Sequence, residues 1–248
     1  MVLWGTIVNA LAIVAGGLLG SVLPRIPEGI RNTVLQGIGL AISVLGITMA
    51  LKTDQILTVI ISLVVGGIIG EILKIEHRLQ RLGDKLQQLL LKKGGTGGRG
   101  SISEGFVTAT LVFCIGAMAI LGPLDSGLKH NHDILYTKAL LDGFLSIIFA
   151  SALGLGVIFS AGPVLVYQGI IALAASLIAM ALSDAALHEI ILVVTGTGGV
   201  IVIGVGLNIL EVKKINVGNM LPALVIAALT VPLKPWIVDL FARIVNPM

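Results

Sequence analysis

The sequence predicts an all-α protein, a polytopic bundle of about seven or eight transmembrane helices. Of its 248 residues, 56% are hydrophobic and only 12% are charged, whereas a soluble domain carries about 25% charged residues. The mean hydropathy is +1.07. Apolar runs of about 20 residues, each long enough to cross a bilayer, follow one another along the whole chain and are separated by short loops that carry proline and charge.

The first part of the chain is expected to hold three spans and an amphipathic helix. The spans are expected at 3–23, 34–51 and 55–73. At 74–93, leucines at helical spacing alternate with arginines and lysines, which predicts a basic amphipathic helix lying on an anionic membrane surface. The glycine-rich linker at 94–104 then separates a first helical repeat, 1–93, from a second helical part, 105–248.

The second part is expected to hold four or five spans. They are placed at 105–121, 136–160, 164–182, 190–210 and 217–231, with a polar loop at 122–133 and a short turn at 161–163. Glycines at 195–199 predict an irregular stretch in the fourth of these. Pro222 and Pro232 predict that the last is kinked or broken. Residues 236–245 either continue it or form an interfacial helix anchored by Trp236.

Basic residues are concentrated in alternate loops. The loops after the first, third and seventh expected spans carry most of the lysines and arginines. Because basic loops face the cytoplasm in most membrane proteins, a chain of eight spans places both termini outside. Lys234 and Arg243 in the C-terminal tail argue against that placement, and a re-entrant final segment would move the C-terminus inside.

A glycine motif recurs at the downstream end of three spans. Small residues four apart form a flat stripe where a second helix backbone approaches closely. In the third copy, Asn208 stands in the place of the second glycine. All three copies sit at the same end of spans that run in one direction, which favours packing between parallel helices. The residues assigned to helix packing are Gly16, Gly20, Gly66, Gly70 and Gly204.

A longer similarity joins 16–46 and 116–149. Each segment has a glycine-rich helix end, a loop with proline and charge, and a second helix. If this is a duplication, three spans starting outside are repeated by three starting inside, the inverted repeat that is typical of secondary transporters. Glycines that only permit tight packing explain the pattern as well, and this alternative is favoured.

Asp142 is the first candidate for chemistry inside the membrane, where an ionisable side chain is costly unless it is paired or hydrated. It lies about two turns into the expected fifth span, and Lys138 lies one turn earlier on the same helix face. A functional Asp142 binds a cation or relays a proton, whereas a structural one only satisfies Lys138. The two interpretations carry equal weight.

Three asparagines complete the candidate substrate or ion pathway. Asn9 lies within the first span, where it makes either a substrate contact or, more simply, an interhelical hydrogen bond. Asn208 and Asn219 belong to a polar run that includes Lys213 and Lys214. A solvated loop is the simpler interpretation of that run. The functional interpretation is a broken-helix site whose backbone groups bind an ion.

Other chemistry is not expected. Cys114 is the only cysteine, so an intramolecular disulfide is excluded. Cys114 and Met118 share a helix face, but two sulfurs without a histidine make a weak Cu(I) site, and ordinary packing is favoured. The histidines and carboxylates at 130–133 and 184–189 fall in expected loops. We predict no metal site, no cofactor and no nucleic-acid partner. We also predict no enzymatic activity, because no acid–base or nucleophile constellation is recognisable.

Three stretches carry a family resemblance. They are 5–9 (GTIVN), 113–123 (FCIGAMAILGP) and 206–224, in which Gly206-Leu207-Asn208 is followed by Asn219 and Leu221-Pro222. In these stretches the chain resembles the domain of unknown function 554 family of bacterial inner-membrane proteins. The resemblance covers essentially the whole chain. It implies a multi-pass protein of the bacterial inner membrane, and it implies no catalytic or binding residue.

The leading hypothesis from the sequence is a transporter or channel for a small ion or solute. It is motivated by the deep polar residues, the glycines that permit irregular helices and the repeat-like pattern. The alternative is a membrane scaffold or sensor that transports nothing and acts through the basic segment at 74–93. The expected partners are the lipid bilayer and a small ion or solute, with a homo-oligomer as a further alternative.

Overall fold

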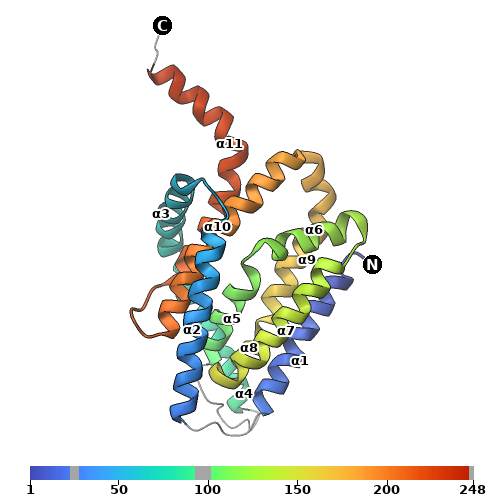
Figure 1. The fold of residues 1–248 in the computed structure, drawn as a ribbon, viewed down its shortest axis with the longest axis vertical. Helices are drawn as coiled ribbons and strands as arrows, with labels where there is room; N and C mark the ends of the chain where they lie inside the picture. The colour runs from blue at the N-terminus through green and yellow to red at the C-terminus, as the bar shows by residue number, and fades with distance from the viewer. Residues whose placement is uncertain (23–27, 93–101, 246–248) are drawn as a thin grey trace.

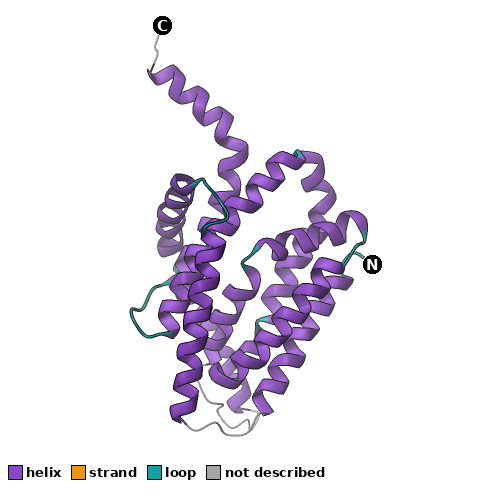
Figure 2. Cartoon of the chain, viewed as in Figure 1, coloured by secondary structure: helices purple, strands orange, loops and turns teal. Residues whose placement is uncertain are grey.

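The computed structural model describes residues 1–22, 28–92 and 102–245, and this part of the chain contains helices and loops but no β-strand (Figure 2). The predicted all-α class is confirmed. Most of the linker predicted at 94–104 lies outside the described residues. The elements are α1 (Trp4–Val22), α2 (Glu28–Ala50), α3 (Ile56–Leu73), α4 (Ile75–Lys92), α5 (Ile102–Cys114), α6 (Ala117–Lys129), α7 (Asp133–Leu153), α8 (Gly156–Phe159), α9 (Ala161–Ala181), α10 (Asp184–Ile209), the 3-10 turn η1 (Val217–Met220) and α11 (Pro222–Val245).

Six helical segments among the described residues are long and apolar enough to cross a membrane. They are α1, α2, α3, α7, α8 with α9, and α10. The bent pair α5–α6 makes a seventh if it counts as one span, and 217–233 forms a shorter apolar helix. The helical membrane bundle is therefore confirmed, and its six spans, or seven with the bent pair, reach the lower end of the predicted count only when that pair is included.

α10 lies at the centre of the bundle. Within its most apolar window 72% of the residues are buried, against 22% for α3. α2 packs antiparallel along one side of α10 (Figure 1), because Gly46 and Gly199 let the two backbones approach closely. α11 packs along another side through Ala227 and Val231, which contact Val193 and Val194. The later part of α11 extends beyond the other helices (Figure 1).

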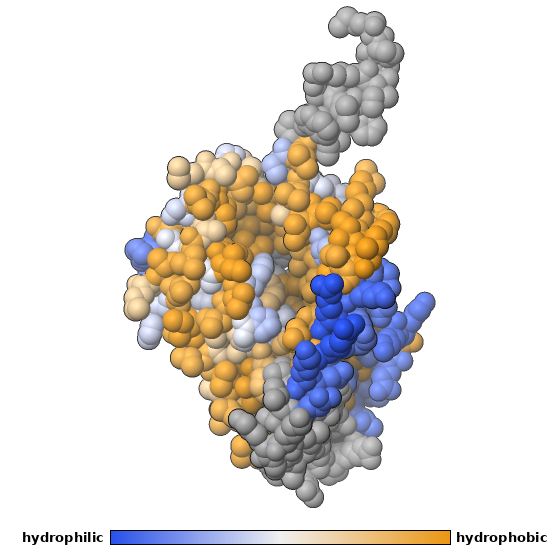
Figure 3. Space-filling view, turned by 180° about the vertical axis from the view of Figure 1, so that it is seen from behind, coloured by the Kyte–Doolittle hydropathy of each residue, from blue (hydrophilic) through white to orange (hydrophobic). Residues whose placement is uncertain are grey.

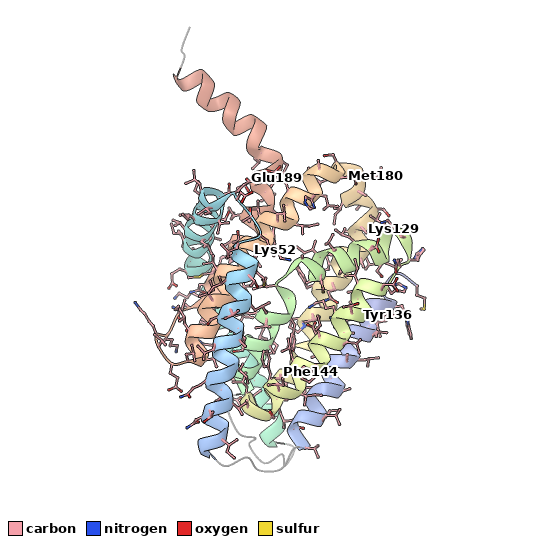
Figure 4. The ribbon with its side chains drawn as sticks, viewed as in Figure 1. Lys52, Lys129, Tyr136, Phe144, Met180 and Glu189 are labelled. Carbon is pink, nitrogen blue, oxygen red and sulfur yellow. The ribbon has the colours of Figure 1, made fainter. Side chains whose placement is uncertain are left out.

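α1 and α7 form a second close pair and run parallel (Figure 1). Gly5 lies beside Leu135 at one end, and Gly20 lies against the carbonyl of Ile147 at the other. α9 packs against α1, and α6 packs against both α7 and α9. The surface of the molecule is largely apolar, with side chains such as Phe144 and Met180 directed outward (Figure 4). This group of helices surrounds the buried polar residues described below.

The basic segments gather at one end of the bundle, the α4 end. α4 packs on the start of α5, where Gly83 meets Ser103. The end of α10 and η1 lie at the same end, since Gly218 contacts Glu76 of α4. Lys52, which the orientation rule leaves for an opposite loop, lies toward the other end (Figure 4). α4 and the loop with Lys213 and Lys214 thus lie at one end, and the loop at 23–27 lies outside the described residues.

The predicted fourth span is not one straight helix. α5 ends at Cys114 and α6 begins at Ala117, and the two axes differ by 62°. Gly116 between them has φ +136°, a backbone conformation that side chains other than glycine rarely adopt. The hydropathy of 105–121 predicted a span but not its break, because the break depends on one backbone angle and leaves the hydropathy unchanged.

Three predicted loops are helical instead, and one of them, 184–189, forms the first turns of α10. The polar loop predicted at 122–133 lies largely within α6, which continues to Lys129 and contains Pro123. The turn predicted at 161–163 lies in the first turn of α9, where a proline is tolerated because the amides there have no helical acceptor. The break in this region comes earlier, at Gly154, which has φ +90°.

The irregular stretch predicted at 195–199 is absent, whereas the last predicted span, 217–231, is divided at Pro222 between η1 and α11. α10 is continuous through 195–199, because those glycines serve close contacts: Gly196 faces Thr53 and Gly199 faces Ala50. α11 is continuous from Pro222 to Val245. The irregular segment precedes it, between Ile209 and Pro222, where η1 interrupts the helices.

The recurrent glycines each face a helix or turn from the second part of the chain. Gly16 lies against the backbone of Gly143 on α7. Gly66 lies against Ala223 of α11, and Gly70 against Asn219 of η1. Gly204 meets Val217 after the end of α10. The copies of the motif thus contact different partners and do not pack on one another.

Candidate functional site

A cluster of buried polar side chains lies between α1, α7 and α9. We call it the polar cluster, and it consists of Thr6, Asn9, Lys138, Asp142 and Gln168. Each member is at most 6% exposed. The helices that surround the cluster are otherwise largely apolar, so these polar residues are unusual within the spans.

Asp142 is the centre of the polar cluster. The Lys138 ammonium lies 3.0 Å from one of its carboxylate oxygens and 2.8 Å from the other. The two residues are one turn apart on α7, so the helix itself places them on one face. Asp142 lies near the middle of α7, far from either end, which makes this an ion pair within the bundle and not an interfacial one.

Asn9 connects the ion pair to a third helix. Its amide nitrogen donates to Asp142 Oδ2 at 3.1 Å and to Gln168 Oε1 at 3.3 Å. The reverse orientation of the Asn9 amide would place its oxygen against two acceptors, so this orientation is the one that the network supports. Asn9 therefore joins α1, α7 and α9 through a single side chain.

Three polar atoms of the cluster have no hydrogen-bond partner among the described residues. They are the Asn9 Oδ1, the Gln168 Nε2 and the Thr6 Oγ1. A buried polar group without a partner costs about 1–3 kcal/mol. The cluster thus holds a balanced ion pair together with an unused acceptor, an unused amide donor and an unused hydroxyl.

The approach of the helices that creates the cluster depends on small residues. Gly143 follows Asp142 and lies against Ala12 of α1. One turn further, the Ser146 hydroxyl donates to the carbonyl of Ile13 at 2.7 Å. Because α7 and α1 touch through small side chains here, the longer side chains of Asn9 and Asp142 reach one another.

Asn208 lies elsewhere and closes a loop. Its amide nitrogen donates to the carbonyl of Ile215 at 2.8 Å, and its oxygen accepts from the Ile215 amide at 2.7 Å. Both groups of the side chain are therefore used within the connection between α10 and η1. The other two copies of the motif have a packing glycine at this position. Here the position holds an asparagine whose side chain closes the loop.

Asn219 joins η1 to the junction of α3 and α4. Its oxygen accepts from the Glu76 amide at 2.7 Å, and its nitrogen donates to Glu71 at 2.6 Å. The Glu76 carboxylate in turn accepts from the Gly218 amide at 2.7 Å. The four pathway candidates thus divide: Asn9 and Asp142 meet in the polar cluster, and Asn208 and Asn219 stabilise the α4 end.

Sequence reasoning missed Gln168 and Thr6. Both were visible as polar residues within apolar runs, Gln168 in the span predicted at 164–182 and Thr6 one turn before Asn9. Neither side chain is ionisable, and a single amide or hydroxyl in an apolar run is equally typical of ordinary helix packing. No group of three or more histidine, cysteine or acidic residues suited to a metal ion occurs among the described residues.

Comparison with known proteins gives a family but no chemistry. Residues 4–232 match the family described as "Protein of unknown function (DUF554)". The chain is 33% identical over 229 residues to the "Uncharacterized membrane protein YdfK" of Bacillus subtilis (strain 168), an alignment that covers 90% of this chain and 93% of the relative. It is 32% identical over 224 residues to the "Uncharacterized protein YqgA" of Escherichia coli (strain K12), which covers 90% and 94%. No solved structure matches.

Proposed function

Since the chain belongs to the DUF554 family of membrane proteins, we propose that it moves a small ion or polar solute across the membrane through the polar cluster. The observation that carries this proposal is the Lys138–Asp142 pair, whose side chains are 7% and 6% exposed, beside three polar atoms without partners. Charges inside a membrane bundle most often mark pathways for ions, protons or substrates.

The chemistry of the cluster suits a small polar species. Asp142 supplies negative charge, and Lys138 balances it when the site is empty of other ions. The free oxygen of Asn9 accepts a hydrogen bond, and the free nitrogen of Gln168 donates one. These groups come from three helices, so a modest movement between α1, α7 and α9 changes all contacts at once.

The broken span supports the same proposal. Discontinuous helices occur near the substrate sites of many transporters, because they allow irregular backbone within the membrane. α5 and α6 break at Gly116, and α6 packs directly on α7 and α9. The inverted repeat suggested by 16–46 and 116–149 remains a prediction, and the proposal does not depend on it.

The proposal is tested by flux in proteoliposomes. The purified protein is screened with protons, sodium, potassium, chloride and small neutral amino acids. We expect Asp142→Asn to lower any flux at least about tenfold, which corresponds to about 1.4 kcal/mol, because the variant keeps the size of the side chain and removes its charge. Asp125→Asn is the matched control, because Asp125 forms a comparable pair with Lys129 whose lysine is 74% exposed. Equal flux in the wild type and in Asp142→Asn would exclude the proposed role.

The alternative function, a scaffold or sensor acting through the basic segment, rests on one face of α4. Arg78, Arg81 and Lys85 are exposed there. Figure 3 shows a continuous hydrophilic area on an otherwise largely apolar face. α4 itself packs on α5 and η1. In the same proteoliposomes, replacing these three residues by glutamine leaves flux unchanged if transport is the function.

A further inference from the structure

A cavity lies at the α4 end, and none of its lining residues belongs to the polar cluster. Its volume is about 550 Å³, within the range of small-molecule sites. α4, α5, the end of α10 and the loop before η1 form its walls. Apolar side chains, among them Leu111, Val205 and Ile209, form part of its lining and are themselves buried. The cavity therefore combines an apolar interior with a polar rim.

The rim carries charges of both signs. Asp84 of α4 and Glu104 of α5 stand on the helical wall, and Lys213 and Lys214 stand on the loop wall beside Glu211. Neither loop lysine forms an ion pair with another residue that the structure describes. The two lysines are thus available to an anionic group within reach of carboxylates.

The loop that carries the lysines is held in place. The two hydrogen bonds between Asn208 and Ile215 close it. Glu211, at the start of this loop, has φ +56°. This left-handed conformation is uncommon in residues other than glycine and is typical of a defined turn. On the opposite side, Glu76 binds the amide of Gly218 and so ties α4 to η1. Both walls are fixed by side chains buried or half-buried beneath the rim.

The Thr108 side chain lines this cavity, and its hydroxyl does not contribute a hydrogen bond to the described part of the fold. It is 8% exposed and lines the cavity. Its hydroxyl forms no hydrogen bond with any other described residue. Threonine in a helix commonly bonds to the carbonyl one turn earlier, so a free hydroxyl that faces a cavity is a contact left for a ligand.

We propose that this cavity binds a small zwitterion that carries an ammonium group and a phosphate or carboxylate group. The anionic group binds Lys213 and Lys214, and the ammonium group binds toward Asp84. Thr108 supplies a further hydrogen bond, and the apolar lining accepts the carbon skeleton. A phosphoethanolamine group has this chemistry, either as a free molecule or as the headgroup of a membrane lipid. The site is separate from the polar cluster and does not rest on the transport proposal.

The test uses the full chain in nanodiscs of phosphatidylglycerol. O-phosphoethanolamine, ethanolamine and inorganic phosphate are each titrated and followed by calorimetry. We expect O-phosphoethanolamine to bind at least tenfold more tightly than either fragment, because only the zwitterion satisfies both walls. In a second arm, phosphatidylethanolamine is added to the nanodiscs and the thermal unfolding temperature is measured. Stabilisation by the lipid without binding of the free zwitterion assigns the site to a lipid headgroup.

Two variants and one control connect the binding to the cavity. Lys213→Gln with Lys214→Gln, and separately Thr108→Val, are expected to weaken binding of whichever zwitterion is found, by tenfold or more for the lysine pair. Lys129→Gln removes an exposed lysine outside the cavity and is expected to leave binding unchanged. The proposal is overturned if neither zwitterion binds, if phosphate alone binds as tightly as O-phosphoethanolamine, or if the paired lysine variant binds like the wild type.

Discussion

Lys138→Met will destabilise the bundle by about 3–5 kcal/mol, because removing one partner of a buried ion pair leaves the other charge uncompensated. Asp142 keeps only the hydrogen bond from Asn9 in this variant. Lys138→Met combined with Asp142→Leu will recover most of the loss, since an apolar replacement of both charges is often neutral or stabilising. Unfolding in bicelles by a denaturing detergent measures both free energies.

The same pair of variants separates stability from function. The double variant will be folded and close to the wild type in stability, yet without flux, because the charges that the proposed pathway uses are gone. Lys129→Met is the control: its ion pair with Asp125 is solvent-exposed on the lysine side, so the change stays below about 1 kcal/mol. A double variant that transports like the wild type would show that the pair only supports the fold.

Gly66→Ala will destabilise the bundle by about 1–3 kcal/mol, whereas Gly67→Ala will be neutral or stabilising by up to about 1 kcal/mol. The two glycines are neighbours on α3 with opposite surroundings. A β-carbon at Gly66 meets the backbone of Ala223, and one at Gly67 meets nothing within 4 Å. Alanine favours the helix equally at both positions, so the difference reports the close contact with α11.

The same unfolding assay in bicelles measures the glycine pair. Because each variant adds one methyl group to the same helix, helix propensity largely cancels in the comparison. Equal effects of Gly66→Ala and Gly67→Ala would contradict the packing of α3 on α11.

The positions of the spans were predictable because hydropathy adds up over about 20 residues. The break at Gly116 was not, since it depends on a single φ of +136° within a run that stays apolar. The helical state of 122–129 was missed for a related reason. Glycine, proline and aspartate usually indicate a loop, but here α6 packs on α9 and Gly127 meets the backbone of Ala172.

The members of the site were partly predictable and their grouping was not. Asp142 and Lys138 are one turn apart, so their pairing follows from the helix. Asn9 lies 133 positions from Asp142, and Asn219 lies 143 positions from Glu76. Polarity within an apolar run identifies such residues one at a time. Only the packing of α1 on α7, and of η1 on α4, decides which of them meet.

Access of water to Asn9 tests the central claim most directly. The background is Cys114→Ser, which removes the only native cysteine. In it, Asn9→Cys is treated in sealed vesicles with a membrane-impermeant thiol reagent. Asn131→Cys, in the loop before α7, is the positive control, and Leu140→Cys, on the apolar α7 at a position 78% exposed, is the negative control. A pathway through the polar cluster predicts that Asn9→Cys reacts, more slowly than Asn131→Cys, while Leu140→Cys does not. Asn9→Cys that stays as unreactive as Leu140→Cys from both sides of the membrane would contradict the proposed pathway.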